Sequence, residues 1–318
     1  MTGPAEFRAA IDETLALLAP FTGAAKGAAP TEPLSDLIRQ CEAASATIEA
    51  RPPEPVRTLH HFACTGGTLI SRCLQAQPNT LLLSEIDPFS AFPRETVAFA
   101  PYDLLKQAQT SLRPLADGIV EDVFLSGVKE IYEASRTRAQ RVIIRDHTHS
   151  HFCTHVDPAS RPLIGKVLER RFNVKSLVTV RHPLDSFLSL RKNGWVHFSP
   201  DTLDDYCRRY DLFLDSYPDA PIVRYEDFVA DPDAGARLMC ETLALSYTES
   251  WLDVLPAVRV SGDSGRKSVE IELRPRRAID DDLLSEAAKS KTFAQLCDRL
   301  GYAADTAAPP LEREAPPA

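Results

Sequence analysis

The sequence lacks long apolar runs and any excess of positive charge. No stretch among its 318 residues approaches the roughly 18 to 20 apolar residues that a membrane helix needs. Its start, MTGPAEFRAA, lacks the basic-then-apolar order of a secretory signal. With 36 Lys and Arg against 45 Asp and Glu, the net charge of −9 provides no cationic field for nucleic acid or an anionic bilayer. We therefore expect a cytoplasmic protein with no membrane insertion and no nucleic-acid partner, in which any polyanion binds a local basic pocket.

The cysteines also lack the pattern of a disulfide scaffold. Seven of them are spread along the chain without a C-x-x-C pair. A chain of this length buries a sizeable core without covalent staples, so we expect reduced thiols. The composition that is present, 44% hydrophobic and 25% charged, excludes collagen-like, fibrous and wholly disordered proteins.

Proline and glycine divide the chain unevenly. A Pro-, Gly- and Ala-rich connector over 20–33 separates two predicted helices, one over 5–18 and one from Leu34 to the break at Arg51. The C-terminal end is too poor in apolar residues to order itself. The predicted parts are an N-terminal helical region (1–55), an α/β domain (56–303) and a flexible tail (304–318).

Short, nearly continuous apolar runs alternate with helical patterns in the central part. Such runs are typical of strands covered on both faces, and this alternation predicts an α/β fold with a mostly parallel central sheet flanked by helices. In such a sheet ligands bind beyond the carboxyl ends of the strands, so the residues that follow each strand are the first site candidates. The predicted strands cover 56–63, 80–86, 140–144, 174–180 and 221–223.

A glycine turn follows the first predicted strand and leads into a helical pattern. The segment reads CTGGTL, from Cys64 to Leu69. Two glycines let the backbone approach a ligand, and the unpaired N–H groups at a helix start favour an anion. Thr65 and Thr68 add hydroxyl groups. An ordinary strand-to-helix turn capped by threonine is the structural alternative, and a Walker A loop is excluded because no Gly-Lys-Ser/Thr follows.

A second candidate anion site follows the fourth predicted strand. Arg181 lies at its carboxyl end, Pro183 suits the first turn of a helix, and Ser189 lies about two turns further on. A guanidinium and a hydroxyl together suit a phosphate group. An ion pair between Arg181 and Asp185 is the structural alternative.

These two sites resemble the sulfotransferases that use 3′-phosphoadenosine-5′-phosphosulfate (PAPS). The family pattern is a loop such as R/K-S-G-T-T-L, then R-x-P-x-D-x-x-x-S, then V-x-Y-E-D-L, and the chain carries counterparts in the same order, the last being VRYEDF at 223–228. The resemblance implies the P-loop-like, three-layer sulfotransferase fold. It also implies transfer of a sulfuryl group from PAPS to a hydroxyl or amine acceptor without a metal, with a carbohydrate as the first acceptor to consider.

The same resemblance implies roles for the residues. The glycine turn would bind the 5′-phosphosulfate, and Arg181 with Ser189 would bind the 3′-phosphate. The segment SGRK, 264–267, resembles the late basic loop of the family, with a solvated basic turn as the alternative. The implied nucleotide-binding residues are Cys64, Thr65, Gly66, Gly67, Thr68, Leu69, Arg181, Ser189, Arg266 and Lys267.

The base and the leaving-group cation are expected at the ends of the second and third strands. Glu85 lies 19 residues after Gly66, where tyrosylprotein-type relatives carry their glutamate base. The segment IIRDH, ending at His147, resembles I-I-K-T-H of the cytosolic relatives, in which the histidine is the base. Arg145 is the leaving-group cation in either alignment. The base is Glu85 or His147, and the gap-free spacing favours Glu85.

One residue departs from the family pattern, because most relatives carry Lys or Arg where this chain has Cys64. A neutral thiol cannot neutralise the transferring group. Either another cation supplies the charge, with Arg145 and Arg72 nearest in sequence, or the chain is a non-catalytic nucleotide-binding relative. A kinase-like phosphotransferase is less favoured, because the loop lacks the P-loop lysine and the Mg²⁺-holding Ser/Thr.

The segment HTHSHFCTH, 147–155, is dense in histidine. If it were a strand, His147, His149 and His151 would share one face and could bind a metal. The spacing matches no standard zinc pattern, so we expect no metal and interpret them as acceptor-pocket residues. Trp195 and His197 could line the same cleft or pack elsewhere.

Overall fold

The chain divides into two compact units, residues 1–53 and 54–318. The structure, a computed structural model, describes residues 34–49, 53–90, 103–261, 271–272 and 275–306, together with residues 9, 12, 13 and 16. In the first unit the predicted second helix is present as α2 (Leu34–Glu49). The predicted helix over 5–18 lies almost entirely outside the described residues, as do the connector over 20–33 and the tail from 307.

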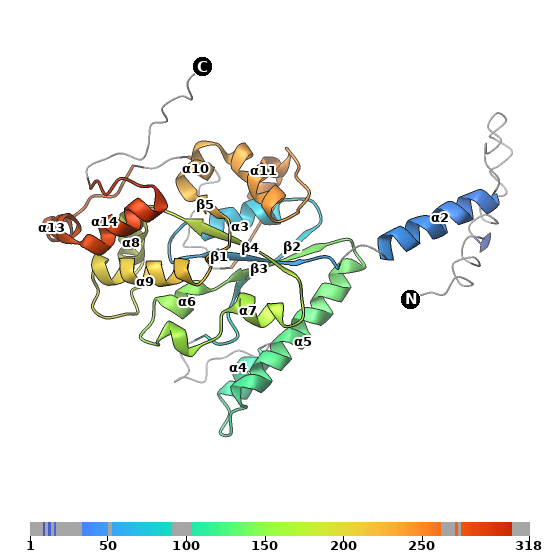
Figure 1. Cartoon of the computed structure of the whole chain (residues 1–318), viewed down its shortest axis with the longest axis horizontal. Helices are drawn as coiled ribbons and strands as arrows, with labels where there is room; N and C mark the ends of the chain where they lie inside the picture. The colour runs from blue at the N-terminus through green and yellow to red at the C-terminus, as the bar shows by residue number, and fades with distance from the viewer. Residues whose placement is uncertain are drawn as a thin grey trace, which may run out of the picture. The chain divides into compact units, whose positions relative to one another are not determined.

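Five strands form the sheet at the centre of the second unit, in the order β2-β3-β1-β4-β5 (Figure 1). Every neighbouring pair is parallel. This confirms the predicted fold class and the five strands, with three differences in bounds. The first strand ends at His61 instead of residue 63, the third extends to include Arg145 and Asp146, and the fifth begins and ends one residue later than predicted. The strands are β1 (Val56–His61), β2 (Thr80–Ile86), β3 (Arg141–Asp146), β4 (Val174–Val180) and β5 (Ile222–Arg224).

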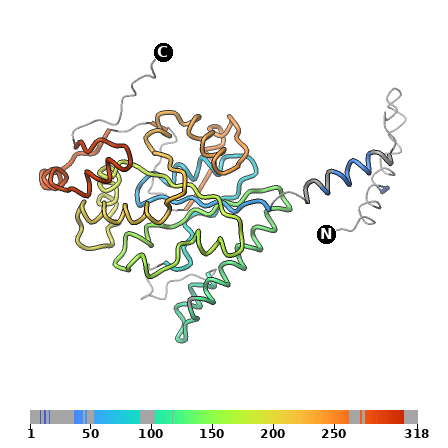
Figure 2. The backbone as a smooth tube through the Cα atoms, viewed as in Figure 1, coloured from blue at the N-terminus to red at the C-terminus, as the bar shows by residue number. Residues whose placement is uncertain are grey.

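Helices cover both faces of the sheet, because alternate residues of each strand point to opposite sides (Figures 1 and 2). Leu59 and Ile143 pack on one side with α3, α10 and α11. Val142 and Ile144 pack on the other side with α5 and α7. The helices of the first side are α3 (Gly67–Gln75), α10 (Tyr225–Ala230), α11 (Pro232–Thr242) and α12 (Trp251–Val254), and those of the second are α4 (Leu104–Gln109), α5 (Asp117–Arg136), α6 (Thr148–Phe152) and α7 (Ile164–Glu169).

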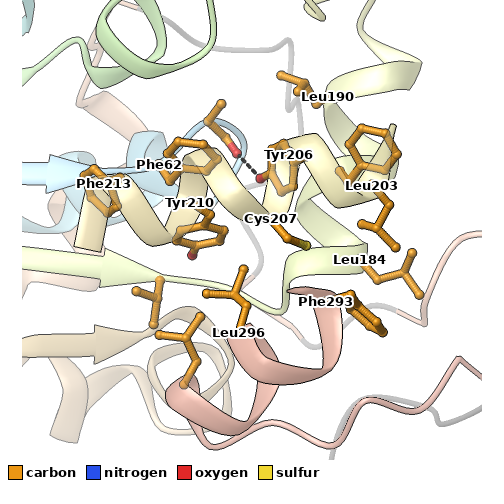
Figure 3. Close-up of a cluster of buried hydrophobic side chains, with 14 of the residues drawn as sticks. Phe62, Leu184, Leu190, Leu203, Tyr206, Cys207, Tyr210, Phe213, Phe293 and Leu296 are labelled. Carbon is orange, nitrogen blue, oxygen red and sulfur yellow. Dashed lines mark hydrogen bonds between the residues drawn. The ribbon is translucent and has the colours of Figure 1, made fainter. Parts of the chain in front are cut away.

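A third buried cluster lies beneath the chain that leaves β1 (Figure 3). The ring of Phe62 stacks on Tyr210 with centroids 4.5 Å apart. The hydroxyl of Tyr206 donates to the carbonyl of Ala63 at 3.0 Å. The residues that lead into the glycine turn therefore pack against a buried cluster of aromatic side chains. The helices of this cluster are α8 (Pro183–Lys192), α9 (Leu203–Asp215), α13 (Asp281–Lys289) and α14 (Lys291–Leu300).

Two short 3₁₀ helices complete the described elements, Pro158–Ser160 and Leu255–Ala257. Among the described residues no helix combines the length and the apolar character that crossing a bilayer requires. The order of the strands matters most for function. Since β1 lies at the centre of the sheet, the connections after β1 and β4 meet where the strand order reverses, which is the usual ligand position in such sheets.

Candidate active site

The turn after β1 has an unusual backbone conformation. Cys64 has φ 65° and Gly66 has φ 89°, both in the left-handed region that L-residues with a side chain seldom adopt. The hydroxyl of Thr65 is buried and donates to the carbonyl of Phe62 at 2.7 Å, so it holds the turn together. Leu69 packs into the core of the α3 side. Within this loop, Thr65 and Leu69 thus stabilise the turn and its helix.

Both glycines of the turn lie against aromatic rings. A Cβ atom added to Gly66 would lie 2.1 Å from Cδ2 of Tyr225, and one added to Gly67 would lie 2.3 Å from Cδ2 of His61. Neither position has room for a side chain. These contacts are a structural reason for the two glycines, beyond the close backbone approach expected from the sequence.

Helix α3 begins at Gly67 without a capping side chain. The N–H group of Leu69 donates to the carbonyl of Gly66 at 3.1 Å, and the positive end of the helix dipole lies at the same point. No acidic residue occupies the first turn. This helix start is therefore able to bind an anion, as the sequence indicated.

Arg181 lies beside the turn. Its Nη1 donates to the carbonyl of Cys64 at 3.4 Å, and its guanidinium carbon lies 5.0 Å from the centroid of the Tyr225 ring. The alternative ion pair with Asp185 is absent, because Asp185 forms a bidentate ion pair with Arg276 at 3.0 and 3.2 Å. Arg181 consequently has no carboxylate partner among the described residues.

Ser189 lies on α8, two turns after Pro183, and is half-buried. No hydrogen bond joins its hydroxyl to Arg181. The pairing of these two residues on one phosphate therefore stays a prediction. Arg266 and Lys267, the other two residues predicted to bind the 3′-phosphate, lie outside the described residues.

Glu85, which is half-buried, and Arg145, which is buried, form an ion pair at the carboxyl ends of β2 and β3. The Nη2 atom of Arg145 lies 2.5 Å from Oε1 of Glu85. Glu85 has φ 58°, and the register of β2 against β3 shifts between Leu83 and Ile86. A bulge of this kind redirects a side chain at the edge of a site. Here it turns Glu85 toward the strand that carries Arg145.

The same guanidinium reaches the glycine turn. Nη2 of Arg145 donates to Oγ1 of Thr68 at 3.4 Å, and Nη1 donates to Oγ of Ser84 at 3.0 Å. His61 accepts from Arg145 at 3.0 Å. Burial, followed by the charge of Arg145, holds the pKa of His61 well below its ordinary value, so this imidazole is neutral. Arg145 therefore links the glutamate to the turn.

His147 lies on the other side of the glutamate. Its Nε2 lies 3.6 Å from Oε2 of Glu85. The two candidate bases predicted from the sequence are thus adjacent. The structure brings Glu85, Arg145, His147 and Thr68 together at one edge of the sheet.

Cys64 is half-buried next to Arg181. Burial raises the pKa of its thiol to about 11, although the charges of Arg181 and Arg277 oppose this shift. The residue is a neutral thiol near neutral pH. Arg72, one of the two cations considered as its replacement, is buried and donates to the carbonyl of Leu255 at 2.8 Å, on the side of α12.

The histidine segment is a helix, so the proposed alternation along a strand is wrong. Residues 148–152 form α6. His149 donates to the carbonyl of Trp195 at 2.8 Å, and its ring lies 5.5 Å from that of His197 and 6.1 Å from that of His147. Burial lowers the pKa of His149 to about 4.

The remaining histidines of the segment point elsewhere. His151 is buried and donates to the carbonyl of Pro158 at 3.0 Å, while His155 is exposed. In the described part of the chain no group of three His, Cys, Asp or Glu side chains could hold a metal ion.

Sequence reasoning missed three contributors to the site. Ser84 and His61 bind Arg145, and Tyr225 packs between Gly66 and Arg181. The histidines at the end of the otherwise apolar strand β1 were a local signal that could have indicated a site residue. Tyr225 belongs to the VRYEDF segment, but its contact with a turn so distant along the chain could not be inferred from a local pattern.

A sequence profile of the sulfotransferase family matches residues 62–249. This chain belongs to the sulfotransferase family. The match spans the glycine turn, Glu85, Arg145 and Arg181, and it confirms the predicted sulfotransferase family. It leaves the acceptor open.

Several solved sulfotransferase structures resemble the chain. They are a sulfotransferase domain from the curacin biosynthetic pathway (16% identity, TM-score 0.44, covering 80% of this chain and 99% of that one), one from the Synechococcus PCC 7002 olefin synthase (18%, 0.41, 80% and 97%) and mouse sulfotransferase SULT7A1 complexed with PAP (11%, 0.38, 80% and 92%). No curated protein matches the chain.

Proposed function

We propose that this sulfotransferase transfers the sulfuryl group of PAPS to a hydroxyl acceptor, with Glu85 as the base and Arg145 as the cation at the leaving group. The observation that carries the proposal is the position of Arg145. Its guanidinium contacts Glu85 at 2.5 Å and Thr68 of the glycine turn at 3.4 Å. One buried residue thus joins the group that would accept a proton to the loop that would bind the departing phosphate.

The residues around the turn fit an anionic nucleotide. The start of α3 has no capping side chain, and Arg181 has no carboxylate partner in the described part of the chain. A half-buried guanidinium without a counter-ion favours binding of an anion, because the partner restores charge balance. We assign the start of α3 to the 5′-phosphosulfate, and Arg181 with Ser189 to the 3′-phosphate. Arg266 and Lys267 are further candidates for the 3′-phosphate.

PAPS supplies the sulfuryl group, whose bond to the 5′-phosphate breaks as the acceptor oxygen bonds to sulfur. The proton of the acceptor must leave at the same time. Oε1 of Glu85 is held by Arg145, whereas Oε2 is buried and makes no hydrogen bond with any described residue. Oε2 is therefore the atom that we assign to receive the proton. Arg145 fixes the carboxylate and adds positive charge near the departing phosphate.

His147 is the second candidate base. It is only 3.6 Å from Oε2 of Glu85, so an acceptor hydroxyl that reaches one group also reaches the other. In our assignment His147 orients the acceptor rather than removing its proton. The gap-free spacing in the sequence supports Glu85, and so does its Oε2 atom, which forms no hydrogen bond with a described residue.

For the acceptor we propose a carbohydrate hydroxyl as the first class to test. The rings of His149, Trp195 and His197 lie together beside His147, with centroids 5.5 to 6.3 Å apart. One indole ring beside imidazole groups that can donate and accept hydrogen bonds suits the binding of a small organic molecule. His149 is neutral near pH 7, so it supplies no positive charge that would favour an anionic acceptor.

Two measurements on the same variants test the proposal. Isothermal titration with adenosine 3′,5′-bisphosphate (PAP) reports donor-site binding. Release of PAP from PAPS in the presence of a monosaccharide, a phenol, an aliphatic alcohol or an amine reports turnover. We expect Glu85→Gln to bind PAP as the parent does and to lose about 10²- to 10⁴-fold in turnover, the usual contribution of a general base. His147→Gln serves as the matched comparison, with a loss of about tenfold or less.

The outcomes separate the alternatives. An active Glu85→Gln with an inactive His147→Gln would move the base to His147. Binding of PAP by the parent with no turnover on any acceptor class would favour a non-catalytic nucleotide-binding relative. Absence of PAP binding would contradict the assignment of the donor site.

A further inference from the structure

Arg145 is held by uncharged acceptors as well as by Glu85. Its Nε and Nη2 atoms both donate to Nε2 of His61, at 3.3 and 3.0 Å. On the other side of the guanidinium, Nη1 donates to Oγ of Ser84 at 3.0 Å and to the carbonyl of Ser261 at 3.1 Å. Arginine has donors and no acceptor, so Nε2 of His61 presents its lone pair to Arg145. The neutral imidazole therefore carries its proton on Nδ1.

This Nδ1 atom of His61 is buried and has no hydrogen-bond partner among the described residues. A buried donor without an acceptor lowers the stability of a fold, and an apolar side chain at this position of the strand would avoid that loss. Proteins keep such groups chiefly where they serve the function. The histidine is therefore explained by what its Nε2 atom does and not by a contribution to stability.

The ring of His61 has little freedom to move. A Cβ atom added to Gly67 at the start of α3 would lie 2.3 Å from Cδ2 and 2.4 Å from Cγ of the ring. The backbone of His61 pairs with Thr179 of β4, and the hydroxyl of Thr148 donates to its carbonyl. A side chain that is fixed by packing on a central strand holds its partner more precisely than one on a loop. His61 thus connects the glycine turn to Arg145 through a fixed ring.

The hold of Glu85 on Arg145 changes during the reaction in our assignment. Once Oε2 of Glu85 has taken the proton, the carboxyl group is neutral and its hydrogen bond to the guanidinium weakens. At that stage negative charge has moved to the departing 5′-phosphate. The neutral His61 keeps its hydrogen bonds to Arg145 through this change and does not cancel the charge of the guanidinium. Burial, followed by the charge of Arg145, keeps the pKa of His61 well below its ordinary value, so the imidazole stays an acceptor.

We propose that His61 is a positioning residue of the transfer reaction, whose Nε2 atom holds the guanidinium of Arg145 where the 5′-phosphate of the nucleotide departs. The inference rests on the proposed function and extends it to a residue outside the motifs that indicated the family. His61 acts on the nucleotide only through Arg145. Loss of the acceptor therefore weakens the contact with the 5′-phosphate and leaves the 3′-phosphate contact of Arg181 unchanged.

Isothermal titration with two nucleotides tests this difference. PAP carries both phosphates, whereas adenosine 3′-phosphate lacks the 5′-phosphate. We expect His61→Leu to weaken PAP by about ten- to a hundredfold, the effect of losing a hydrogen bond between charged groups. The affinity for adenosine 3′-phosphate should stay within about twofold of the parent, because that nucleotide does not use Arg145. His61→Gln should restore most of the affinity for PAP, since its amide oxygen can accept from Arg145 in place of Nε2.

A double-mutant cycle shows whether His61 acts through Arg145. Arg145→Met removes every donor that Nε2 of His61 accepts from. In that background His61→Leu should change the affinity for PAP by about twofold or less, because an effect exerted through a partner disappears with the partner. Rescue by His61→Gln carries the test if Arg145→Met does not fold. His61→Asn replaces His61→Leu if the latter does not fold, since its shorter amide does not reach Arg145.

A matched control removes a different buried histidine. His151 is also buried, but it donates to the carbonyl of Pro158 at 3.0 Å. His151→Leu should leave both affinities within about twofold of the parent, because the two sites share no partner. A loss of PAP affinity in His151→Leu as large as that in His61→Leu would show a general effect of removing a buried histidine, and it would overturn the inference.

The remaining outcomes separate this inference from the proposed function. If the parent binds PAP and His61→Leu binds it equally well, the inference is wrong while the donor site stands. Equal losses for PAP and adenosine 3′-phosphate would indicate damage to the whole turn and would also overturn it. The same holds if His61→Gln binds as weakly as His61→Leu, or if His61→Leu has its full effect in the Arg145→Met background. If the parent binds neither nucleotide, the proposed function fails, and this inference fails with it.

Discussion

Replacing Gly66 with alanine perturbs the centre of the glycine turn. The residue has φ 89°, and a left-handed conformation costs an L-residue with a side chain about 1 to 2 kcal/mol. The new Cβ would also lie 2.1 Å from Cδ2 and 2.5 Å from Cε2 of Tyr225. Such overpacking costs about 1 to 3 kcal/mol, because the ring must move. Together these effects predict a loss of about 2 to 5 kcal/mol in the free energy of unfolding.

Urea unfolding of the parent and Gly66→Ala measures this loss as a fall in the midpoint at unchanged slope. Gly127→Ala is the control, since Gly127 lies within α5 with nothing within 4 Å of its added Cβ. Alanine there should stabilise the helix by about 0.5 to 1 kcal/mol. A Gly→Ala change that destabilises the protein at position 66 and stabilises it at position 127 would show that the local geometry decides the effect.

The two contributions at Gly66 can be separated. In a Tyr225→Ala background the ring is absent, so the loss caused by Gly66→Ala should fall to the backbone share of about 1 to 2 kcal/mol. The displaced ring should also weaken PAP binding in the single variant, because Tyr225 packs on Arg181. A Gly66→Ala protein that unfolds at the same urea concentration as the parent would refute the reasoning.

Two further predictions concern titration. Burial, followed by the charge of Arg276, lowers the pKa of His182 to about 4, against about 6.5 in an unfolded chain. The stability that depends on neutral His182 is complete above pH 6.5 and is lost as the pH falls toward 4, by on the order of 3 kcal/mol. Urea unfolding should therefore show that the parent exceeds His182→Gln in the free energy of unfolding by less at pH 4.5 than at pH 7. An equal excess at both pH values would contradict the prediction. Cys64, whose thiol pKa is about 11, should react with iodoacetamide at pH 8 about a hundredfold more slowly than exposed Cys41, and equal rates by mass spectrometry would contradict its burial.

Local patterns were sufficient for the main elements of the sheet. The second and fourth strands have the predicted bounds, because uninterrupted apolar runs are a strong signal for strands covered on both faces. The residues at the carboxyl ends of those strands, Glu85 within β2 and Arg181 directly after β4, then had to lie at one edge, since all strands are parallel. The pattern was less reliable for residues 148–152, whose alternating histidines form a short helix.

The contacts that define the site were harder to infer. The ion pair between Asp185 and Arg276 stands in place of the local pair between Asp185 and Arg181 that was the structural alternative. Its partners are 91 residues apart, so no periodicity links them. The left-handed conformation of Glu85 likewise has no local sequence signal, because it arises from a bulge between two strands.

The amino-acid sequence by itself determined the α/β class, the family and the candidate residues, because hydrophobic periodicity and short motifs are local properties. Only the tertiary structure decided which of those residues meet. It joins Arg145 to both Glu85 and Thr68, and it commits Asp185 to Arg276. The physical reason is that ion pairs and close ring contacts depend on distances between strands and helices. Those distances are set by packing of the whole sheet and not by spacing along the chain.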